Sequence, residues 1–459
     1  MDRRLALLVA AAFFMEILDA TVIAPAAPHI AADLGVSPVD VNVAVTAYIL
    51  TVAVLVPVSG WLADRAGPRR VFAAAIVLFT LASVGCALAP NLGVLVGTRV
   101  LQGVGGAMMV PVGRLVVLRT TDRSDLVRAI AYLTWPALLA PVLAPALGGL
   151  LAEYASWRWI FLVNVPLGIA ALVATRSLVP RVPALDPGRL DRTGFLLGAS
   201  GIAALVGGLE LLGTGTPRWF AVGALLVAAA VLLTAAVRHL LRTRRPLVDL
   251  RVLGVHTLRT TAGAGSVFRA VITAVPFLLP LFFQLGFGWS AAQAGLVVIA
   301  LFVGNVGIKP ATTPLMRRFG ARSVMVASVA ASVAMLVAIA FLQAQTPLWL
   351  VVAVLVASGI GRSVGFTTYN SIAFADVEPD RMTPANTLVS TLQEVSAGLG
   401  VAVGALLVRL GDVVAPDSGT TPYRIAFLAL AVLLAPAVVA ALRLPRDAAA
   451  AVTGHAARS

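Results

Sequence analysis

Charged and sulfur-containing side chains are scarce in this sequence. Of its 459 residues only 12% are charged, four are histidine, and one, Cys86, is cysteine. A single cysteine excludes an intramolecular disulfide, and no Cys/His framework for a metal ion is visible. Soluble globular domains carry about 25% charged residues, so this chain does not have the composition of a water-soluble protein.

Apolar residues, in contrast, make up 60% of the chain. That excess cannot be hidden in one soluble core, so lipid has to be part of the solvent. A membrane helix needs about 20 apolar residues. Runs of that size occupy the ranges 5–27, 41–63, 71–89, 93–118, 127–152, 158–178, 194–212, 217–237, 258–286, 290–312, 322–342, 347–372, 385–409 and 424–443. The sequence predicts an all-α polytopic membrane protein with 14 transmembrane helices.

The net charge of +14 comes from basic residues in short loops between the apolar runs. A nucleic-acid-binding protein gathers such charge into a stripe, so that class is excluded. Every second loop is basic, except that Asp376, Glu378 and Asp380 outnumber Arg381 in the loop before the range 385–409. Arginine and lysine mark the cytoplasmic side. We therefore expect both termini in the cytoplasm. Lys309 is the only lysine among 34 basic residues, a bias that suggests a bacterium of high GC content and its cytoplasmic (inner) membrane.

A loop sequence repeats within the chain. Gly60–Arg70 closes the second span, and Pro314–Arg322, a degraded copy, closes the matching span of the last six. Two related six-helix halves are a common plan of transporters. We expect an N-terminal six-helix bundle at 1–178, two inserted helices with linkers at 179–256, a C-terminal six-helix bundle at 257–445 and a tail at 446–459.

Two spans carry buried charges that predict an ion pair. Arg99 lies inside the fourth span, where an arginine costs about 2.5–3.5 kcal/mol and needs a partner or a water cavity. Glu16 and Asp19 share one face of the first span. At 1.5 Å per residue, Asp19 and Arg99 lie roughly 12 Å and 9 Å from the outer ends of their helices. We expect them to meet, either as proton carrier and counter-charge or as a purely structural pair.

Glycines and prolines mark two further segments. In the first of the two loop sequences, Gly60–Arg70, glycines permit a tight turn and close helix contact. The residues of interest in this segment are Gly60, Asp64, Arg65, Gly67, Arg69 and Arg70. Prolines four residues apart remove backbone hydrogen bonds and bend a helix. The fifth span has such a pair followed by two glycines, at Pro141, Pro145, Gly148 and Gly149.

Together these motifs resemble the major facilitator superfamily, and specifically its fourteen-helix drug/proton antiporter branch. The resemblance covers essentially the whole chain, with Asp19, Gly60–Arg70, Arg99–Gly106 and Ala140–Gly149 at the positions of the motifs. It implies two six-helix bundles plus two inserted helices, a charged cytoplasmic latch at Asp64, and a proton relay at Arg99.

The same resemblance implies a proton-coupled exporter of small amphiphilic compounds, which works by alternating access as a monomer. Its energy source is the proton gradient and it needs no cofactor. A dedicated metabolite or lipid exporter, or a proton symporter, is the alternative on this fold. Because the sequence has no HExxH, GxSxG or Walker segment, we do not expect an enzyme or direct coupling to ATP.

Several residues within the spans are candidates for the substrate cavity, although helix packing alone explains most of the aromatic ones. Aromatic side chains suit amphiphilic ligands, and Arg269 and Arg362 suit an anionic ligand. We expect Glu394 to be a second proton-coupling carboxylate beside Glu16 and Asp19. The cavity candidates are Phe14, Tyr48, Gln102, Trp135, Arg269, Phe277, Phe283, Arg362, Tyr369 and Gln393.

The alternation of basic loops makes a topological prediction. Green fluorescent protein fused after Ser459 should fluoresce, and alkaline phosphatase fused there should be inactive, because an even number of spans returns the chain to the cytoplasmic side. Paired fusions of alkaline phosphatase and green fluorescent protein measure this. Strong phosphatase activity from the Ser459 fusion would contradict the predicted topology.

Overall fold

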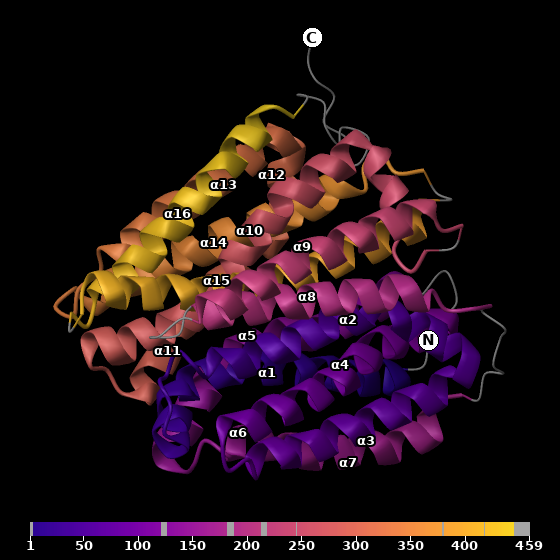
Figure 1. Ribbon diagram of the computed structural model, residues 1–459, viewed down its shortest axis with the longest axis horizontal. Coiled ribbons are helices and arrows are strands. Elements are labelled where there is room, and N and C mark those ends of the chain that lie inside the picture. Colours follow the sequence, from indigo (N-terminus) through magenta and orange to yellow (C-terminus); the bar gives the residue numbers. More distant parts are fainter. Residues whose placement is uncertain are drawn as a thin grey trace. The chain divides into compact units, whose positions relative to one another are not determined.

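The computed structural model describes residues 3–120, 126–180, 188–212, 218–244, 246–378, 381–416 and 418–444. Within these ranges, the side chains of residues 118–138, 210, 382 and 383 are not described. The described residues form helices and connecting loops and contain no strand (Figure 1). The chain divides into two compact units, Met1–Phe195 with Ser290–Gly295, and Leu196–Trp289 with Leu296–Ser459.

Unit 1 contains the helices of the first six predicted spans. The sixth span is interrupted at Val163, which separates a single turn from the longer helix that follows. The helices are α1 (Arg3–Leu34), α2 (Asn42–Ala66), α3 (Pro68–Ala87), α4 (Leu92–Thr120), α5 (Leu126–Tyr154), α6 (Trp159–Leu162) and α7 (Asn164–Leu178).

Unit 2 contains most of the remaining helices. They are α8 (Arg192–Leu212), α9 (Trp219–Arg242), η2 (Leu250–Gly254), α10 (His256–Leu281), the π-helical turn η3 (Phe282–Gly286), α11 (Ala291–Gly307), α12 (Lys309–Phe319), α13 (Ala321–Ala340), α14 (Leu348–Ala373), α15 (Met382–Val414) and α16 (Thr421–Leu442). The first residues of α8 and of α11 fall in unit 1.

The predicted all-α membrane architecture is confirmed. Among the described residues, twelve helices are long and apolar enough to cross a membrane, and the bent pair of α11 and α12 makes a thirteenth span. The one predicted span not yet accounted for is the fifth, 127–152. It coincides with α5, whose segment Leu139–Tyr154 is apolar. Each predicted range is therefore occupied by helix.

The range 290–312 is not the single straight helix that we expected. It breaks between Gly307 and Lys309, and α11 and α12 meet there at an angle of 47°. Pro310 explains the break, because proline cannot donate the backbone hydrogen bond that would continue α11 but is accepted in the first turn of a new helix. The resulting α12 continues to Phe319, beyond the predicted end.

The two units repeat one packing scheme. In unit 1, α1 packs against α4 and α5, and α3 packs against α4 and α7. In unit 2, α10 packs against α14 and α15, and α13 packs against α14 and α16. Helices α1, α3, α4, α5 and α7 thus correspond to α10, α13, α14, α15 and α16.

The repeated loop sequence has the same structure in both units. Gly67 ends α2 with φ +87°, and Gly320 ends α12 with φ +80°. Two residues later, Arg69 donates to the carbonyl of Arg176 at the end of α7, and Arg322 donates to the carbonyl of Leu442 at the end of α16. Each arginine satisfies a carbonyl that a helix C-terminus leaves without an intrahelical partner. The sequence repeat is therefore a structural repeat.

Glycines of α5 permit close helix packing. A Cβ at Gly148 would lie 2.2 Å from the carbonyl oxygen of Val22 on α1, and a Cβ at Gly149 would lie 2.3 Å from that of Ala291.

We expected a close helix contact at Gly60 as well, but Gly60 is exposed, and a Cβ there would meet no atom within 4 Å. Of the two loop glycines, Gly67 therefore has the conformational role and Gly60 makes no close contact.

Substitution of Gly148 tests this packing. We expect Gly148→Ala to destabilise the protein by about 1–3 kcal/mol, because a new methyl group would force α1 and α5 apart. Gly198→Ala on α8 is the matched control, since its Cβ would meet no atom within 4 Å; there we expect no loss, because alanine favours helix. Melting temperatures of the purified variants measure the difference, and equal melting temperatures would refute close packing at Gly148.

Candidate functional site

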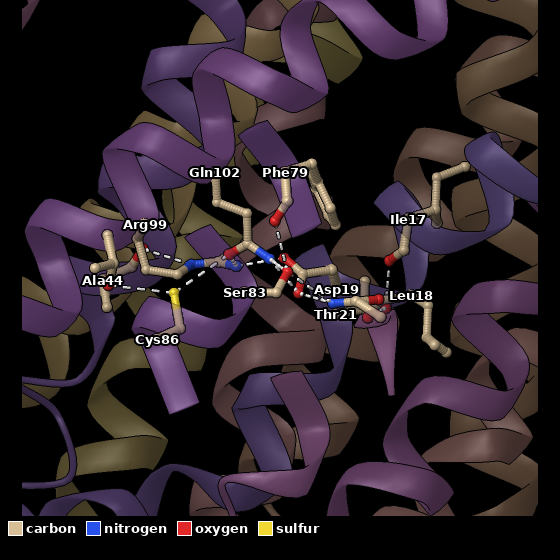
Figure 2. A network of polar contacts seen from close by, with 12 residues as sticks. Ile17, Leu18, Asp19, Thr21, Ala44, Phe79, Ser83, Cys86, Arg99 and Gln102 are labelled. Carbon is tan, nitrogen blue, oxygen red and sulfur yellow. Dashed lines mark hydrogen bonds and ion pairs between the residues drawn. The ribbon is translucent and has the colours of Figure 1, made fainter. Parts of the chain in front are cut away.

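Unit 1 contains a buried ion pair within a network of polar contacts (Figure 2). Arg99 on α4 donates through Nη1 to Oδ2 of Asp19 on α1, and both side chains are 0% exposed. Arg99 also donates through Nε to the carbonyl oxygen of Ala44 on α2, at 3.3 Å. The predicted meeting of Asp19 and Arg99 is confirmed, and the guanidinium joins three helices.

Amide side chains complete the surroundings of Asp19. Gln102, one turn after Arg99, accepts from Arg99 Nη1 at 2.7 Å and donates through Nε2 to Oδ1 of Asp19 at 2.8 Å. Asn164 at the start of α7 donates to the same Oδ1 at 2.8 Å. The Asp19 carboxylate thus accepts from one guanidinium and two amides. All four side chains are fully buried.

Two small polar residues of α3 support this network. Ser83 accepts from Gln102 Nε2 at 2.8 Å and donates to the carbonyl of Phe79 at 2.8 Å. Cys86, also buried, points its thiol at Oε1 of Gln102 at 3.5 Å. Gln102 is therefore part of the ion-pair network, and its assignment to a cavity wall stays a prediction.

Aromatic and acidic side chains lie beside the ion pair. The guanidinium of Arg99 lies 4.1 Å from the ring centroid of Tyr48 on α2, a cation–π distance. A Cβ at Gly106 would lie 3.0 Å from the Tyr48 hydroxyl and 3.4 Å from Oε1 of Glu16. Tyr48 thus extends from Arg99 toward Glu16, which is half-buried. The structure places Glu16, Asp19, Tyr48 and Arg99 in one neighbourhood.

Sequence reasoning missed Ser83 and Asn164. Each is a short polar side chain in an apolar run, and such residues usually satisfy their own helix backbone. Only their buried position reveals the role, because a buried amide has to find partners. Asn164 had one available signal, since it is the only Asn or Gln in the run 158–178.

A second group of predicted residues gathers around a cavity in unit 2. This cavity has a volume of about 30 Å³ and is lined by residues of α10, α14 and α15, including Arg269, Tyr369 and Gln393. Gln393 donates to Oδ1 of Asn370 at 2.6 Å, and Arg269 lies 5.0 Å from the ring centroid of Phe366. Arg362 and Glu394 are near neighbours of Arg269.

Other cavity candidates have structural positions. Phe277 and Phe283 are 3% and 0% exposed, and Phe283 stacks on Trp289 with ring centroids 5.0 Å apart. Both are packed in the core, and their assignment to a substrate cavity stays a prediction. Phe14 is half-buried on α1. The side chain of Trp135 lies outside the described residues.

The predicted latch segment lies at the end of α2 and the start of α3. Arg65 lies over the Trp61 ring at 5.7 Å, and Arg69 makes the helix-end contact described above. Asp64 is half-buried and Arg70 is exposed. The latch at Asp64 stays a prediction.

The helix α5 continues through Pro141 and Pro145 without a break. The bend of α5 at these prolines stays a prediction.

The ion pair makes a prediction about stability. Arg99→Met should destabilise the protein by about 3–5 kcal/mol, because it leaves Asp19 as a buried charge without its partner. Combining it with Asp19→Leu should recover much of that loss, because both charges are then absent. Melting temperatures of the two single variants and the double variant form a thermodynamic cycle. Additive losses would contradict a direct interaction.

Comparisons with known proteins place this fold and site in context. The family model of the Major Facilitator Superfamily matches residues 9–275 and 261–458. A Cronobacter sakazakii relative, "Putative multidrug resistance protein MdtD", is 40% identical over 447 residues, which are 96% of this chain and 94% of the relative. The Escherichia coli protein of the same name is 39% identical over 448 residues, with the same coverage of both chains.

Solved structures share the fold at low sequence identity. An auto-inhibited peptide transporter of the POT family superposes with a TM-score of 0.70 at 18% identity and covers 100% of this chain and 98% of its own. The D-xylose-proton symporter has a TM-score of 0.66 at 15% identity, covering 97% and 98%. With these matches over nearly its whole length, the chain belongs to the major facilitator superfamily and is a multi-pass membrane transporter, not an enzyme.

Proposed function

We propose that the protein exports small amphiphilic organic compounds, including drugs, in exchange for protons. The observation that carries the proposal is a carboxylate and a guanidinium fully buried together in the membrane-spanning part of unit 1, at Asp19 and Arg99. Ionisable groups at such positions are expensive and mark ion or substrate pathways. The multidrug resistance names of the MdtD relatives support the substrate class.

Proton uptake by Asp19 is the proposed coupling step. A protonated carboxyl has a donor on one oxygen, whereas the present network directs three donors at it. Protonation therefore weakens the hold of Arg99 and Gln102 on α1 and releases contacts between α1 and α4. Tyr48 and Glu16 provide the neighbouring groups toward which Arg99 can turn. We propose Glu394 as a second carboxylate that acts in unit 2.

The energy available is sufficient for export. A proton that enters the cell gains about 2.3 kcal/mol for each 100 mV of inside-negative potential, and a pH gradient adds to it. Alternating access of a monomer, in the cytoplasmic membrane of a bacterium with both termini inside, completes the proposal. No bound cofactor is required, because the proton gradient supplies the work.

Substitution of two of the three acids of α1 tests the coupling. Asp19→Asn should abolish proton-driven export, with a loss of more than about 100-fold, because the amide cannot bind and release a proton. Asp33→Asn on the same helix is the matched control: Asp33 is 45% exposed and pairs with Arg158 at 2.7 Å. We expect Asp33→Asn to export at the wild-type rate.

Inverted membrane vesicles with an internal pH-sensitive dye provide the measurement. An antiporter releases protons from acidified vesicles when substrate is added, and Asp19→Asn should eliminate that signal. Full proton-driven export by Asp19→Asn would refute the assignment. Substrate and protons moving in the same direction would show a symporter, and a response to one metabolite or lipid alone would show a dedicated exporter.

A further inference from the structure

Unit 2 contains two arginines, Arg362 buried and Arg269 half-buried, that bond to no acid in the described part of the chain. Arg362 on α14 is 7% exposed, and its Nε and Nη1 atoms have no hydrogen-bond partner among the described residues. The same holds for Nε of Arg269 on α10. The two guanidinium groups lie close enough to repel each other. Such donors, shielded from water, need an acceptor.

The nearby acid does not balance these charges. Glu394 on α15 attracts Arg269 but makes no ion pair with it within the described residues. Two arginines and one glutamate leave an excess of one positive charge when all three are ionised. In unit 1, by contrast, the fully buried Arg99 pairs directly with Asp19. On the corresponding helices of unit 2, α10 and α14, both charges are positive.

The cavity beside Arg269 has the properties of a head-group site. Its volume of about 30 Å³ holds about two water molecules, whereas a whole drug-sized ligand needs about 300–1,000 Å³. Asn370 and Gln393 provide amide groups on its wall, and the buried Tyr369 hydroxyl has no partner among the described residues. Phe366, below Arg269, contributes an apolar surface.

We propose that Arg269, which lines the cavity, binds an anionic group, such as a carboxylate, of the exported compound, and that the nearby Arg362, which is not part of the cavity lining, adds its positive charge. The anion accepts hydrogen bonds from guanidinium N–H groups that are otherwise unpaired, and it neutralises the excess charge. Arginine suits this role because its planar fork matches a carboxylate with two parallel bonds. The apolar remainder of the compound lies outside the small cavity.

This inference rests on the proposed function and names its substrate class as amphiphilic organic anions. It also changes the energetics of transport. Exchange of one monovalent anion, moving out, for one proton, moving in, transfers two elementary charges in the direction favoured by an inside-negative potential. A neutral substrate would transfer only one.

Three probes of matched size test the inference on the purified full-length protein. They are 2-naphthoate, 2-naphthamide and 2-naphthylmethylammonium, which carry a negative charge, no charge and a positive charge. We expect 2-naphthoate to bind about tenfold more tightly than either of the others, a difference of one charge-assisted contact. Isothermal titration calorimetry measures the three dissociation constants. Equal affinities, or a preference for the cation, would overturn the inference.

Variants assign any preference to the arginines. Arg362→Gln and Arg269→Gln should each weaken 2-naphthoate binding about tenfold without changing 2-naphthamide binding, and Arg362→Lys should retain part of the preference. Arg259→Gln is the matched control, because Arg259 is an exposed arginine on the same helix as Arg269. A preference that survives both glutamine substitutions would overturn the assignment. If one variant does not fold, the other and the wild-type probe series still decide.

Transport assays separate this inference from the proposed function. Anion binding through the arginines without proton exchange would leave the inference standing and reject proton-coupled export. Proton-driven export of tetraphenylphosphonium by a protein that does not prefer 2-naphthoate would reject the inference and leave the export mechanism standing.

Discussion

A charge inside a membrane helix is stable only when a partner lies within reach, and unit 1 depends on how Asp19 and Arg99 meet that requirement. An unpaired arginine at this depth costs about 2.5–3.5 kcal/mol on insertion scales. The pair and its amides connect α1, α3, α4 and α7, because Ser83 and Asn164 join the same network. A change in the charge of Asp19 therefore acts on the packing of four helices at once.

Unit 2 has the same helix arrangement as unit 1 but lacks a fully buried carboxylate–arginine pair among its described residues. Its packing scheme repeats that of unit 1, and Gly320 and Arg322 reproduce the roles of Gly67 and Arg69. Its charges do not follow the repeat, because Arg269 and Arg362 have no bonded carboxylate among the described residues. The repeat extends to the backbone turns but not to the buried polar groups. In our proposals, the main proton carrier Asp19 lies in unit 1, and the arginines that bind the substrate lie in unit 2 together with a second carboxylate, Glu394.

Much of the architecture was predictable because lipid imposes a strong constraint on sequence. Apolar runs located the helices to within several residues, and depth along two helices predicted the meeting of Asp19 and Arg99. Side-chain surroundings were harder to predict. Gln102, Phe277 and Phe283 were assigned to a cavity, but composition cannot distinguish a cavity wall from a packed core. The break before Pro310 follows from the local chemistry of proline, which the hydropathy of the range 290–312 does not record, whereas the role of the Asn164 amide depends on tertiary contacts.

The position of Cys86 has a practical consequence. It is the only cysteine of the chain, and its thiol is fully buried against Gln102. A thiol reagent can therefore reach it only when α3 and α4 separate at the network. The natural sequence is thus already close to a cysteine-free background, in which a fluorophore or spin label on one added cysteine reports from a single known place. Slow modification of Cys86 itself would record how often the interior of unit 1 opens.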